Sequence, residues 1–346
     1  MRYNFSKEHN MKFLIIGLGS MGKRRIRCLQ SLKYHEISGF DLRADRRDET
    51  RQKYGIKVFD NFEKAAAETH PDALIISVPP DKHLQYMEYC IEKKIHFFVE
   101  ASVVDHGMKN LIKKLEKSGI TAAPSATMMF HPAIMAIKNI VDSRELGKLS
   151  NVLLHSGQFL PDWHTYEKVS EYYVSNPATG GGREIVPFEL TWFTMVFGMP
   201  KRVGGNFRKT INIEGAEKID DTYNCLLDYE DFLSVVTVDV VSRYATRRLT
   251  VNGDQKQLYW SWDENCVKVY DPASDKWEQR GYEMKNAQSG YNANIGENMY
   301  IDEISNFIDA VSGKRAFINT MSMDYKVLQL LYKIEKSDKN SLLVRV

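Results

Sequence analysis

The sequence Lys12-Phe13-Leu14-Ile15-Ile16 runs directly into Gly17-Leu18-Gly19-Ser20-Met21-Gly22, and residues 23–32 then have the pattern of a helix. An apolar strand that leads through a G-x-G-x-x-G turn into a helix is typical of a dinucleotide phosphate site. The first glycine allows the tight turn, the second lets a pyrophosphate approach the backbone, and the third lets the helix pack on the strand. The N-terminus of that helix offers unpaired N–H groups to the phosphates. The predicted cofactor-binding residues of the turn are Gly17, Gly19, Ser20, Met21 and Gly22. The alternative is a glycine-rich turn without a ligand.

Strands and helices alternate in the sequence from residue 11 to residue 127. Short apolar segments at 36–40, 73–78, 95–99 and 120–123 are separated by helical patterns. The continuous apolar run of 73–78 is typical of a central parallel strand that is buried on both faces. Repeated β-α-β units of this length imply a doubly wound parallel sheet. Residues 11–127 are therefore predicted to form an N-terminal Rossmann domain that binds a dinucleotide.

The pattern changes after about residue 127. The later segments are longer and richer in β-branched and aromatic residues, which favours strands joined by short turns. Residues 128–346 are therefore predicted to form a C-terminal α/β domain with a mostly antiparallel open sheet, which serves substrate binding and oligomerisation. One helix is predicted at 185–197, and two more at 297–311 and 323–335; whether these last helices pack back on the first domain is left open. Because ligands of open α/β sheets sit at the carboxyl ends of strands, we expect the active cleft where the two domains meet.

The composition is that of an ordinary globular protein. The chain has 346 residues, of which 43% are hydrophobic and 27% charged, and its formal net charge is +2. This charge gives no reason to expect nucleic acid or a membrane surface as a partner, and no apolar run is long enough for a membrane span. Residues 1–10 are polar and lack the apolar core of a signal peptide.

The cysteines indicate neither a metal site nor a disulfide framework. No C-x-x-C pair occurs, and the four cysteines lie far apart in the sequence, at Cys28, Cys90, Cys225 and Cys266. Metal sites and disulfide-rich domains show closer and more regular spacings. Reduced thiols in a cytoplasm fit this pattern best.

A carboxylate follows the second predicted strand. Asp41 stands near the position of the acid that hydrogen-bonds the adenosine ribose hydroxyls in NAD sites, and it would repel the 2′-phosphate of NADP. Arg43, two residues later, could instead accept that phosphate or stack on adenine. Asp41 and Arg43 are therefore predicted cofactor contacts, with NAD favoured and NADP left open. The alternative role for Asp41 is to cap the helix that follows.

A proline-rich exit follows the central strand of the first domain, with the sequence Val78-Pro79-Pro80-Asp81-Lys82-His83. The prolines force an extended path out of the sheet, and His83 then falls in the first turn of a helix at the carboxyl edge. Pro79 and His83 are therefore candidate cofactor contacts. A solvated surface histidine is the alternative for His83.

Several of these segments occur in the order found in a known family. The glycine turn at 17–22, the segment 78–83, Glu100 after the next strand, and Gly180-Gly181-Gly182 before a helix follow one another over almost the whole chain. The chain thus resembles the glucose–fructose oxidoreductase/inositol dehydrogenase (Gfo/Idh/MocA) family. The resemblance implies a Rossmann domain, a C-terminal domain with an open antiparallel sheet, and NAD(P)-dependent oxidation or reduction of sugars, sugar derivatives or cyclitols. It also implies homo-oligomers formed through that sheet.

Two departures from the family pattern concern the chemistry. Family members usually carry Glu-Lys-Pro after this strand, and the lysine serves in proton transfer at the reacting hydroxyl, whereas this chain has Glu100-Ala101-Ser102. Ala101 has no titratable group, while Glu100 is retained, and the resemblance implies that Glu100 meets the nicotinamide ribose. On the helix after the triple glycine, Val186 and Glu189 occupy the positions of the family's aspartate and histidine, unless the alignment shifts by one residue.

Other residues are candidates to replace the lost lysine. A polar and aromatic loop before the triple glycine suits a pyranose ring, whose C–H faces stack on aromatic side chains while its hydroxyls need polar partners. The predicted acid–base residue of this loop is His164, which titrates near neutrality. Glu184 and Glu189 are predicted to serve the same role if burial raises their pKa values. The predicted substrate contacts are Asp162, Trp163, Tyr172 and, from the resemblance, His131. Packing and turn or helix capping are the alternatives for each of these residues.

Three functions compete on this sequence. The favoured hypothesis is an NAD(P)-dependent oxidoreductase that acts on a hydroxyl or carbonyl of a sugar, amino-sugar or nucleotide-sugar. The second is an enzyme that keeps its NAD bound and uses it transiently for elimination, epimerisation or glycoside cleavage. The third, motivated by Ala101 alone, is a dinucleotide-binding protein without catalytic activity.

Overall fold

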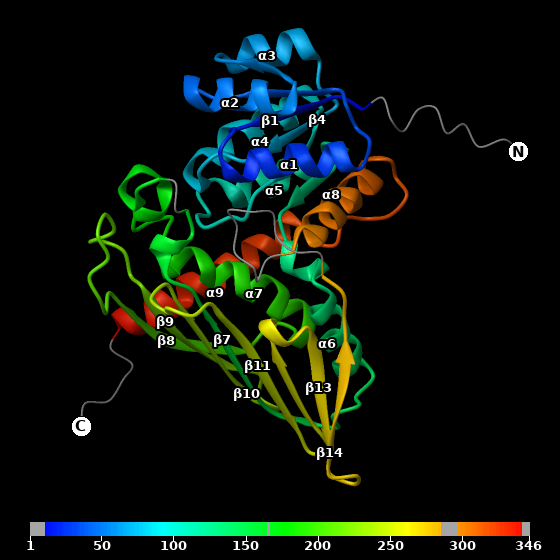
Figure 1. Ribbon diagram of the computed structural model, residues 1–346, viewed down its shortest axis with the longest axis vertical. Coiled ribbons are helices and arrows are strands. Elements are labelled where there is room, and N and C mark those ends of the chain that lie inside the picture. The colour runs from blue at the N-terminus through cyan, green and yellow to red at the C-terminus, as the bar shows by residue number, and fades with distance from the viewer. Residues whose placement is uncertain (1–10, 165–166, 285–295, 341–346) are drawn as a thin grey trace, which may run out of the picture. The chain divides into compact units, whose positions relative to one another are not determined.

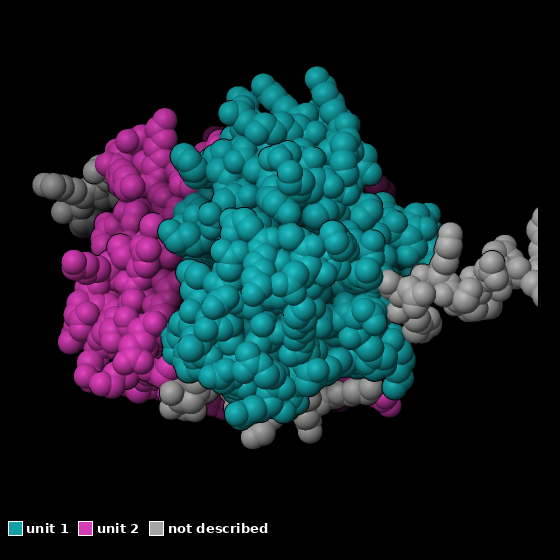
Figure 2. Space-filling model, turned by 90° about the horizontal axis from the view of Figure 1, so that it is seen from above, with its two compact units in different colours: residues 1–126, 300–325 teal, residues 127–299, 326–346 magenta. Residues whose placement is uncertain are grey.

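The computed structural model describes residues 11–164, 167–284 and 296–340 (Figure 1). The chain divides into two compact units, which Figure 2 shows in two colours. Unit 1 contains residues 1–126 and 300–325, and unit 2 contains residues 127–299 and 326–346. Within the described ranges, no helix combines the length and the apolar character needed to cross a membrane.

The core of unit 1 is a six-stranded sheet in the order β3-β2-β1-β4-β5-β6, and every pair of neighbouring strands is parallel. Its strands are β1 (Phe13–Ile16), β2 (Ile37–Phe40), β3 (Lys57–Phe59), β4 (Ala73–Ile76), β5 (His96–Val99) and β6 (Ala122–Pro124). All residues of the neighbouring strands β1 and β4 are buried, as their unbroken apolar sequences predicted. The direction of strand order reverses between these two strands, which makes the unit a Rossmann fold with its switch point at the glycine turn.

Helices connect the parallel strands of unit 1: α1 (Ser20–Ser31), α2 (Ala44–Tyr54), α3 (Phe62–Thr69), α4 (His83–Lys93) and α5 (Met108–Leu115). Local sequence explains several of their ends. The side chain of Asn61 accepts a hydrogen bond from the Lys64 N–H and so caps α3, and Gly55 adopts the left-handed conformation that ends α2. A later helix, α8 (Glu297–Val311), also packs here, since the ring of Phe307 meets the ring of Phe98 on β5 edge-on.

Unit 2 is built on an eight-stranded sheet in the order β14-β13-β12-β11-β7-β10-β9-β8. Its strands are β7 (Leu149–Gly157), β8 (Arg202–Arg208), β9 (Thr222–Asp228), β10 (Leu233–Asp239), β11 (Thr246–Gly253), β12 (Gln257–Ser261), β13 (Cys266–Asp271) and β14 (Lys276–Gly281). All neighbours are antiparallel except β7 and β10, which run parallel. The predicted fold class is therefore confirmed: a parallel Rossmann sheet is followed by a mostly antiparallel open sheet.

One face of the larger sheet is covered by helices. Helix α7 (Gly182–Phe197) packs on β9 and β10, and α6 (Pro132–Asp142) packs on β13. Helix α9 (Met321–Lys339) covers β8, since a Cβ at Gly205 would lie 3.1 Å from a methyl carbon of Ile334. Figure 1 shows these helices along one side of the strands. The strands accordingly alternate between buried apolar side chains and exposed ones, as in β9.

Two edge strands of the larger sheet were not predicted. β8 contains Gly204 and Gly205, which weaken the strand pattern, yet a Cβ at Gly205 would lie only 2.3 Å from the Asn224 carbonyl oxygen of the neighbouring strand. β14 reads Lys-Trp-Glu-Gln-Arg-Gly and is mostly exposed, so no apolar alternation marks it. Both strands lie at the edges of the sheet. Edge strands bury less of their surface, so the alternation of apolar and polar residues is weaker in them.

Candidate active site

The glycine turn after β1 has the close backbone approaches that exclude side chains. Gly17 has a φ of +90°, and a Cβ there would lie 2.6 Å from the carbonyl oxygen of Ser77. A Cβ at Gly22 would lie 1.9 Å from the carbonyl oxygen of Gly17. Gly19, by contrast, meets only the side chain of Arg46, so its exposed backbone remains open to a ligand. The turn therefore fits a dinucleotide pyrophosphate at the N-terminus of α1, with Ser20 and Met21 as the first helical residues.

The carboxylate of Asp41 is tied to this turn. Its Oδ2 accepts a hydrogen bond of 2.7 Å from the Leu18 N–H, and its Oδ1 accepts one of 2.8 Å from the Arg43 N–H. A carboxylate has about four acceptor positions, so both oxygens keep capacity for ribose hydroxyls. The residue at the N-cap of α2 is Arg43, and no side chain caps that helix, so Asp41 is not its N-cap residue.

Of two arginines beside Asp41, the structure places Arg46 rather than Arg43 over the phosphate turn. The guanidinium of Arg43 is exposed and donates to both oxygens of Asp45, at 3.1 and 2.6 Å. Arg46 has its Nη1 3.9 Å from Asp41 Oδ2 and 3.3 Å from the place of a Cβ on Gly19. The sequence pattern did not single out Arg46, because only the fold brings the first turn of α2 against the glycine turn.

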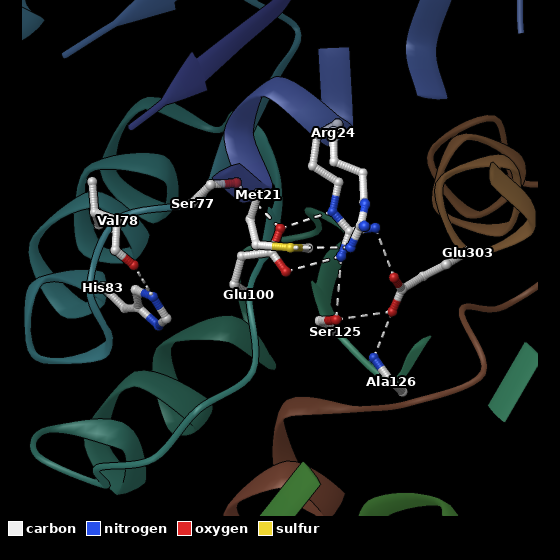
Figure 3. Close-up of polar contacts among 10 residues, drawn as sticks. Met21, Arg24, Ser77, Val78, His83, Glu100, Ser125, Ala126 and Glu303 are labelled. Carbon is white, nitrogen blue, oxygen red and sulfur yellow. Dashed lines mark hydrogen bonds and ion pairs between the residues drawn. The ribbon is translucent and has the colours of Figure 1, made fainter. Parts of the chain in front are cut away.

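Glu100, directly after β5, lies in a network of buried polar groups (Figure 3). Its Oε1 accepts from Arg25 Nε at 2.7 Å and from Ser77 Oγ at 3.2 Å, and its Oε2 accepts from Arg25 Nη2 at 2.9 Å. The Glu100 side chain keeps 14% of its surface exposed, whereas that of Arg25 is fully buried. Burial by itself would lower the pKa of Arg25, but Glu100 and Glu303 raise it well above its usual value, so Arg25 stays charged.

His83 is hydrogen-bonded to the backbone of the turn that follows β4. It is buried, and its Nε2 donates to the carbonyl oxygen of Val78 at 2.9 Å, which fixes the neutral tautomer with the proton on Nε2. Burial also lowers its pKa. Pro79 is extended, as the proline pair predicted, and Pro80 begins a short 3₁₀ helix ahead of α4 that was not predicted. His83 therefore fixes the turn after β4 as a neutral residue.

In unit 2, a buried carboxyl lies at the start of α7. Glu184 accepts a hydrogen bond of 2.5 Å from the Tyr173 hydroxyl on its Oε1, while its Oε2 is buried and has no hydrogen-bond partner among the described residues. Burial raises the pKa of Glu184 to about 7, and the Tyr173 hydroxyl opposes this shift only in part. At neutral pH this carboxyl therefore exchanges its proton readily.

Aromatic side chains from the preceding loop contact one another, and Tyr173 links them to Glu184. The ring of His164 stacks on Tyr172 with centroids 4.8 Å apart, and Tyr172 meets Tyr173 edge-on. His164 Nδ1 also lies 2.9 Å from Glu167 Oε1. Trp163, Tyr172 and Tyr173 pack against one apolar group, and the indole N–H of Trp163 is buried without a partner in the described part of the chain. The aromatic–acid cluster is the set Trp163, His164, Tyr172, Tyr173 and Glu184.

The triple glycine allows this arrangement, because a side chain at these positions would clash or be strained. A Cβ at Gly180 would lie 2.1 Å from the carbonyl oxygen of Val174, and Gly181 has a φ of +66°. The Gly182 N–H donates to the Asp220 carbonyl oxygen at 2.9 Å. The loop thus passes close over the start of α7, and Tyr173 reaches Glu184 from it.

Glu189 lies five residues further along α7 in a different environment. It is fully buried and accepts from Arg247 Nε at 3.0 Å, Arg247 Nη2 at 2.7 Å and Ser156 Oγ at 2.9 Å, all on Oε1. Its Oε2 accepts from the Trp192 indole N–H at 2.6 Å. These contacts describe a buried ion pair inside unit 2, in which both carboxylate oxygens of Glu189 accept hydrogen bonds.

The last two predicted substrate contacts are His131 and Asp162. His131 caps α6, with its Nδ1 accepting from the Ala133 N–H at 3.1 Å, and its ring lies against Trp260 and Tyr282. Burial, assisted by the charge of Arg247, lowers the pKa of His131 to about 3. Asp162 is exposed at the end of a short 3₁₀ helix. These contacts give His131 a structural role as a neutral helix cap.

Two family models match this chain. Residues 11–120 match the oxidoreductase family with an NAD-binding Rossmann fold, and residues 134–259 match the GFO/IDH/MocA C-terminal domain. The chain belongs to the Gfo/Idh/MocA oxidoreductase family. The resemblance seen in the sequence is thereby confirmed, and this family member is an NAD-binding enzyme. Curated proteins give no match to the chain.

Solved structures share the fold along nearly the whole chain. An oxidoreductase from Agrobacterium radiobacter, in complex with NAD⁺, L-tartaric acid and magnesium, has a TM-score of 0.82 at 14% identity, covering 96% of this chain and 97% of that one. Levoglucosan dehydrogenase with NADH and levoglucosan has a TM-score of 0.82 at 12% identity, covering 95% and 97%. UDP-N-acetylglucosamine 3-dehydrogenase from Acidithiobacillus ferrooxidans has a TM-score of 0.75 at 14% identity, covering 96% and 99%. At these identities the similarity shows the fold.

The glycine turn and Asp41 of this family member are compatible with bound NAD. Gly17 and Gly22 have no room for a side chain, and Asp41 presents a carboxylate where a 2′-phosphate would add a second negative charge. Residues that the sequence reasoning did not select, namely Arg25, Arg46, Tyr173 and Glu303, complete the two polar regions. No sequence pattern marks them, because their partners are distant in the chain or belong to another element.

Proposed function

We propose that this enzyme oxidises a hydroxyl of a sugar, amino-sugar or nucleotide-sugar with NAD, or catalyses the reverse reduction, and that Glu184 carries the proton. The observation behind the proposal is the buried Glu184 carboxyl, whose Oε1 is held by Tyr173 and whose Oε2 has no partner among the described residues. Ala101 cannot serve as acid or base, so the reaction needs such a group elsewhere.

The proposed step transfers one hydride and one proton. In the oxidation, the C–H bond of the reacting carbon breaks as a hydride leaves, the O–H proton passes to Glu184 Oε2, and a carbonyl forms. NAD supplies the hydride acceptor when it is bound. Tyr173 fixes Glu184 through Oε1, so that Oε2 is the atom that receives the proton. In the reduction, the protonated Glu184 returns this proton to the forming alkoxide.

A sugar-like substrate is supported by the side chains around Glu184. The aromatic–acid cluster offers aromatic faces, a buried indole N–H at Trp163 and the His164–Glu167 pair. Carbohydrate sites combine aromatic faces for C–H groups with polar atoms for hydroxyls. Among the structures with this fold, one is a levoglucosan dehydrogenase and another a UDP-N-acetylglucosamine 3-dehydrogenase, so sugars and nucleotide-sugars are the first substrates to test.

The decisive experiment follows NADH absorbance with purified enzyme, NAD and a panel of neutral sugars, amino-sugars and nucleotide-sugars. Because oxidation requires the ionised carboxyl, we expect the rate to rise as the pH passes through about 7. A panel without any NADH formation, in either direction and at every pH, would contradict the proposal. Turnover without net NADH would instead select transient use of the cofactor, by elimination, epimerisation or glycoside cleavage.

The open face of the larger sheet supports a homo-oligomer. Leu153 on β7, Val235 on β10 and Leu226 on β9 stand side by side in the strand register, and Leu153 and Leu226 are 47% and 51% exposed. Leu233, on the same face of β10, is 62% exposed. Such a row of exposed leucines on one sheet face fits a second copy of the chain. Light scattering should give at least a dimer, and Leu153→Glu should shift it toward the monomer.

A cytoplasmic location is part of the same proposal. All four cysteines, at positions 28, 90, 225 and 266, are buried free thiols. Reduced thiols of this kind are usual in reducing compartments.

A further inference from the structure

A charged network links helix α8 to the carboxylate at the end of β5 (Figure 3). Arg25 donates through Nε and Nη2 to Glu100 and through Nη1 to Glu303 Oε2 at 2.8 Å. Arg25 and Glu303 are 278 positions apart in the sequence. The side chains of Arg25 and Glu303 are fully buried. One guanidinium thus joins a carboxylate at the ligand edge of the sheet to a carboxylate in the interior.

Glu303 is anchored to the backbone at the end of β6. Its Oε1 accepts from the Ala126 N–H at 2.6 Å and from Ser125 Oγ at 3.0 Å. Its Oε2 accepts from Arg25 Nη1. The Glu303 side chain is fully buried, and its position determines where the guanidinium of Arg25 lies.

The hydrogen bonds of Glu100 leave one acceptor position for a ligand. Oε1 already accepts two hydrogen bonds, from Arg25 and Ser77, whereas Oε2 accepts one, from Arg25. A carboxylate oxygen accepts about two hydrogen bonds. One acceptor position on Oε2 therefore remains, and the Glu100 side chain is 14% exposed.

The strand order assigns the half of the dinucleotide that reaches Glu100. A bound dinucleotide would place its phosphates at the glycine turn after β1 and its adenosine ribose at Asp41 after β2. On the opposite side of β1 the next strands are β4, which ends before Ser77, and β5, which ends before Glu100. Glu100 would therefore face the ribose at the nicotinamide end of the cofactor.

We infer that Arg25 and Glu303 are positioning residues, which hold Glu100 so that its Oε2 accepts a hydrogen bond from a hydroxyl of the nicotinamide ribose. This inference rests on the NAD-binding part of the proposed function and is independent of the substrate. Glu303→Gln replaces an acceptor by an amide N–H₂ group, which must face either Arg25 Nη1 or the Ala126 N–H. Either choice sets donor against donor and moves the guanidinium, and Glu100 moves with it.

The test compares NADH with ADP, which contains the adenosine half of the cofactor and lacks the nicotinamide ribose. For Glu303→Gln we expect NADH to bind roughly tenfold more weakly in a calorimetric or fluorescence titration, the change for one lost hydrogen bond to a charged group. ADP should bind as it does to the unaltered enzyme. Glu100→Gln should show the same pattern, and the double variant should be no weaker than the single ones, because both remove the same hydrogen bond.

Two controls separate positioning from general damage. Glu335→Gln breaks the pair with Arg183, of 2.7 Å and mostly buried in unit 2, so it matches the chemical change and should leave NADH binding unaltered. Asp41→Asn should weaken NADH and ADP together. If Glu303→Gln does not fold, Ser125→Ala removes one hydrogen bond from Glu303 Oε1 without a change of charge and should weaken NADH selectively, by less.

The outcomes are distinct from those of the catalytic proposal. Equal weakening of NADH and ADP in Glu303→Gln, or no weakening of either, overturns the positioning role. An unaltered enzyme that binds no NADH overturns it as well. NADH binding with the selective loss, but without dehydrogenase activity on any substrate, supports the positioning role and contradicts the proposed reaction.

Discussion

Carboxyl groups in the two units are buried in contrasting ways. In unit 1, Glu100 and Glu303 share the guanidinium of Arg25, and both are held by hydrogen bonds from several donors. In unit 2, Glu184 has a single neutral donor, the Tyr173 hydroxyl, and burial raises its pKa to about 7. A cation beside a buried carboxyl favours the charged form, whereas burial alone favours the proton. The first arrangement suits binding and orientation, and the second suits proton transfer.

In the described part of the chain, each unit contains buried carboxyls with and without an arginine partner. The neighbouring side chains, rather than the unit, therefore decide whether a buried carboxyl favours its charged form. In unit 2, Glu189 is paired with Arg247 only a few residues along the helix from Glu184. In unit 1, Asp324 on α9 is bonded to Ser102, has no partner on Oδ2 among the described residues, and has its pKa raised to about 7 by burial. Among the described residues, each unit thus contains buried carboxyls that are paired with an arginine, and each also contains a buried carboxyl that has only a hydroxyl partner.

The largest effect is expected at Glu184. Glu184→Gln keeps the side chain volume but removes the proton acceptor, so kcat should fall by roughly 10²–10⁴-fold while NADH binding is preserved. The pH dependence through about 7 should disappear with it. Steady-state kinetics on the substrate found in the panel, with a parallel NADH titration, measures both. An unchanged kcat would remove Glu184 from the mechanism.

Glu189→Gln tests the paired carboxyl of the same helix. The substitution leaves the buried guanidinium of Arg247 without its counter-ion, and this should lower the free energy of unfolding by about 3–5 kcal/mol. Denaturant titration measures the loss. Replacing both residues, as Glu189→Gln with Arg247→Met, should cost less than the single change, because no buried charge is left unpaired. A variant with native stability but no activity would instead assign Glu189 to catalysis.

Asp324→Asn tests the unpaired carboxyl of unit 1 through the pH dependence of stability. The pKa of Asp324 rises from 3.8 to about 7 on folding, so the folded state binds this proton more tightly than the unfolded state does. The resulting stabilisation is complete below pH 3.8 and is lost as the pH rises through about 7. The asparagine variant lacks this contribution, so its stability relative to the unaltered protein should increase across that window. Thermal denaturation at a series of pH values measures the difference, and parallel curves would contradict it.

The smallest effect is expected at an exposed pair. Arg43→Ala breaks the contact between Arg43 and Asp45. Because both side chains are about half exposed or more, the free energy of unfolding should change by only about 0–1 kcal/mol. NADH affinity should also be nearly unaltered, because the guanidinium of Arg43 faces Asp45. Arg46→Ala is the matched comparison, since Arg46 lies over Gly19 and should show the larger change in NADH affinity. If Arg43→Ala weakened NADH binding more than Arg46→Ala, Arg43 would be the cofactor contact instead.

Much of the fold was predictable because its signals are local. The buried strands β1 and β4 are continuous apolar runs, and the alternation of strands and helices in the first third has one common solution. The edge strands β8 and β14 were not predicted, because β8 contains two adjacent glycines and β14 is mostly polar. The parallel pairing of β7 with β10 inside a mostly antiparallel sheet also left no trace in the sequence.

The candidate site was predictable only in part. The glycine turn and Asp41 follow from spacing along one β-α-β unit, and Glu184 follows from its place after the triple glycine. Tyr173 lies beside a residue that was selected, but its hydroxyl became important only through its contact with Glu184. Glu189 had equal standing with Glu184 in the sequence, and only the folded chain pairs it with Arg247.

The sequence by itself determined a Rossmann unit with a dinucleotide turn, since the steric demands on Gly17 and Gly22 come from residues of the same β-α-β unit and the strand beside it. The tertiary structure decided which carboxyls hold charge and which hold a proton. A carboxyl's charge depends on its solvation and its neighbours in space, and these come from anywhere in the chain. Glu303 reaches Arg25 across 278 positions, while no cation is paired with Glu184 in the described part of the molecule.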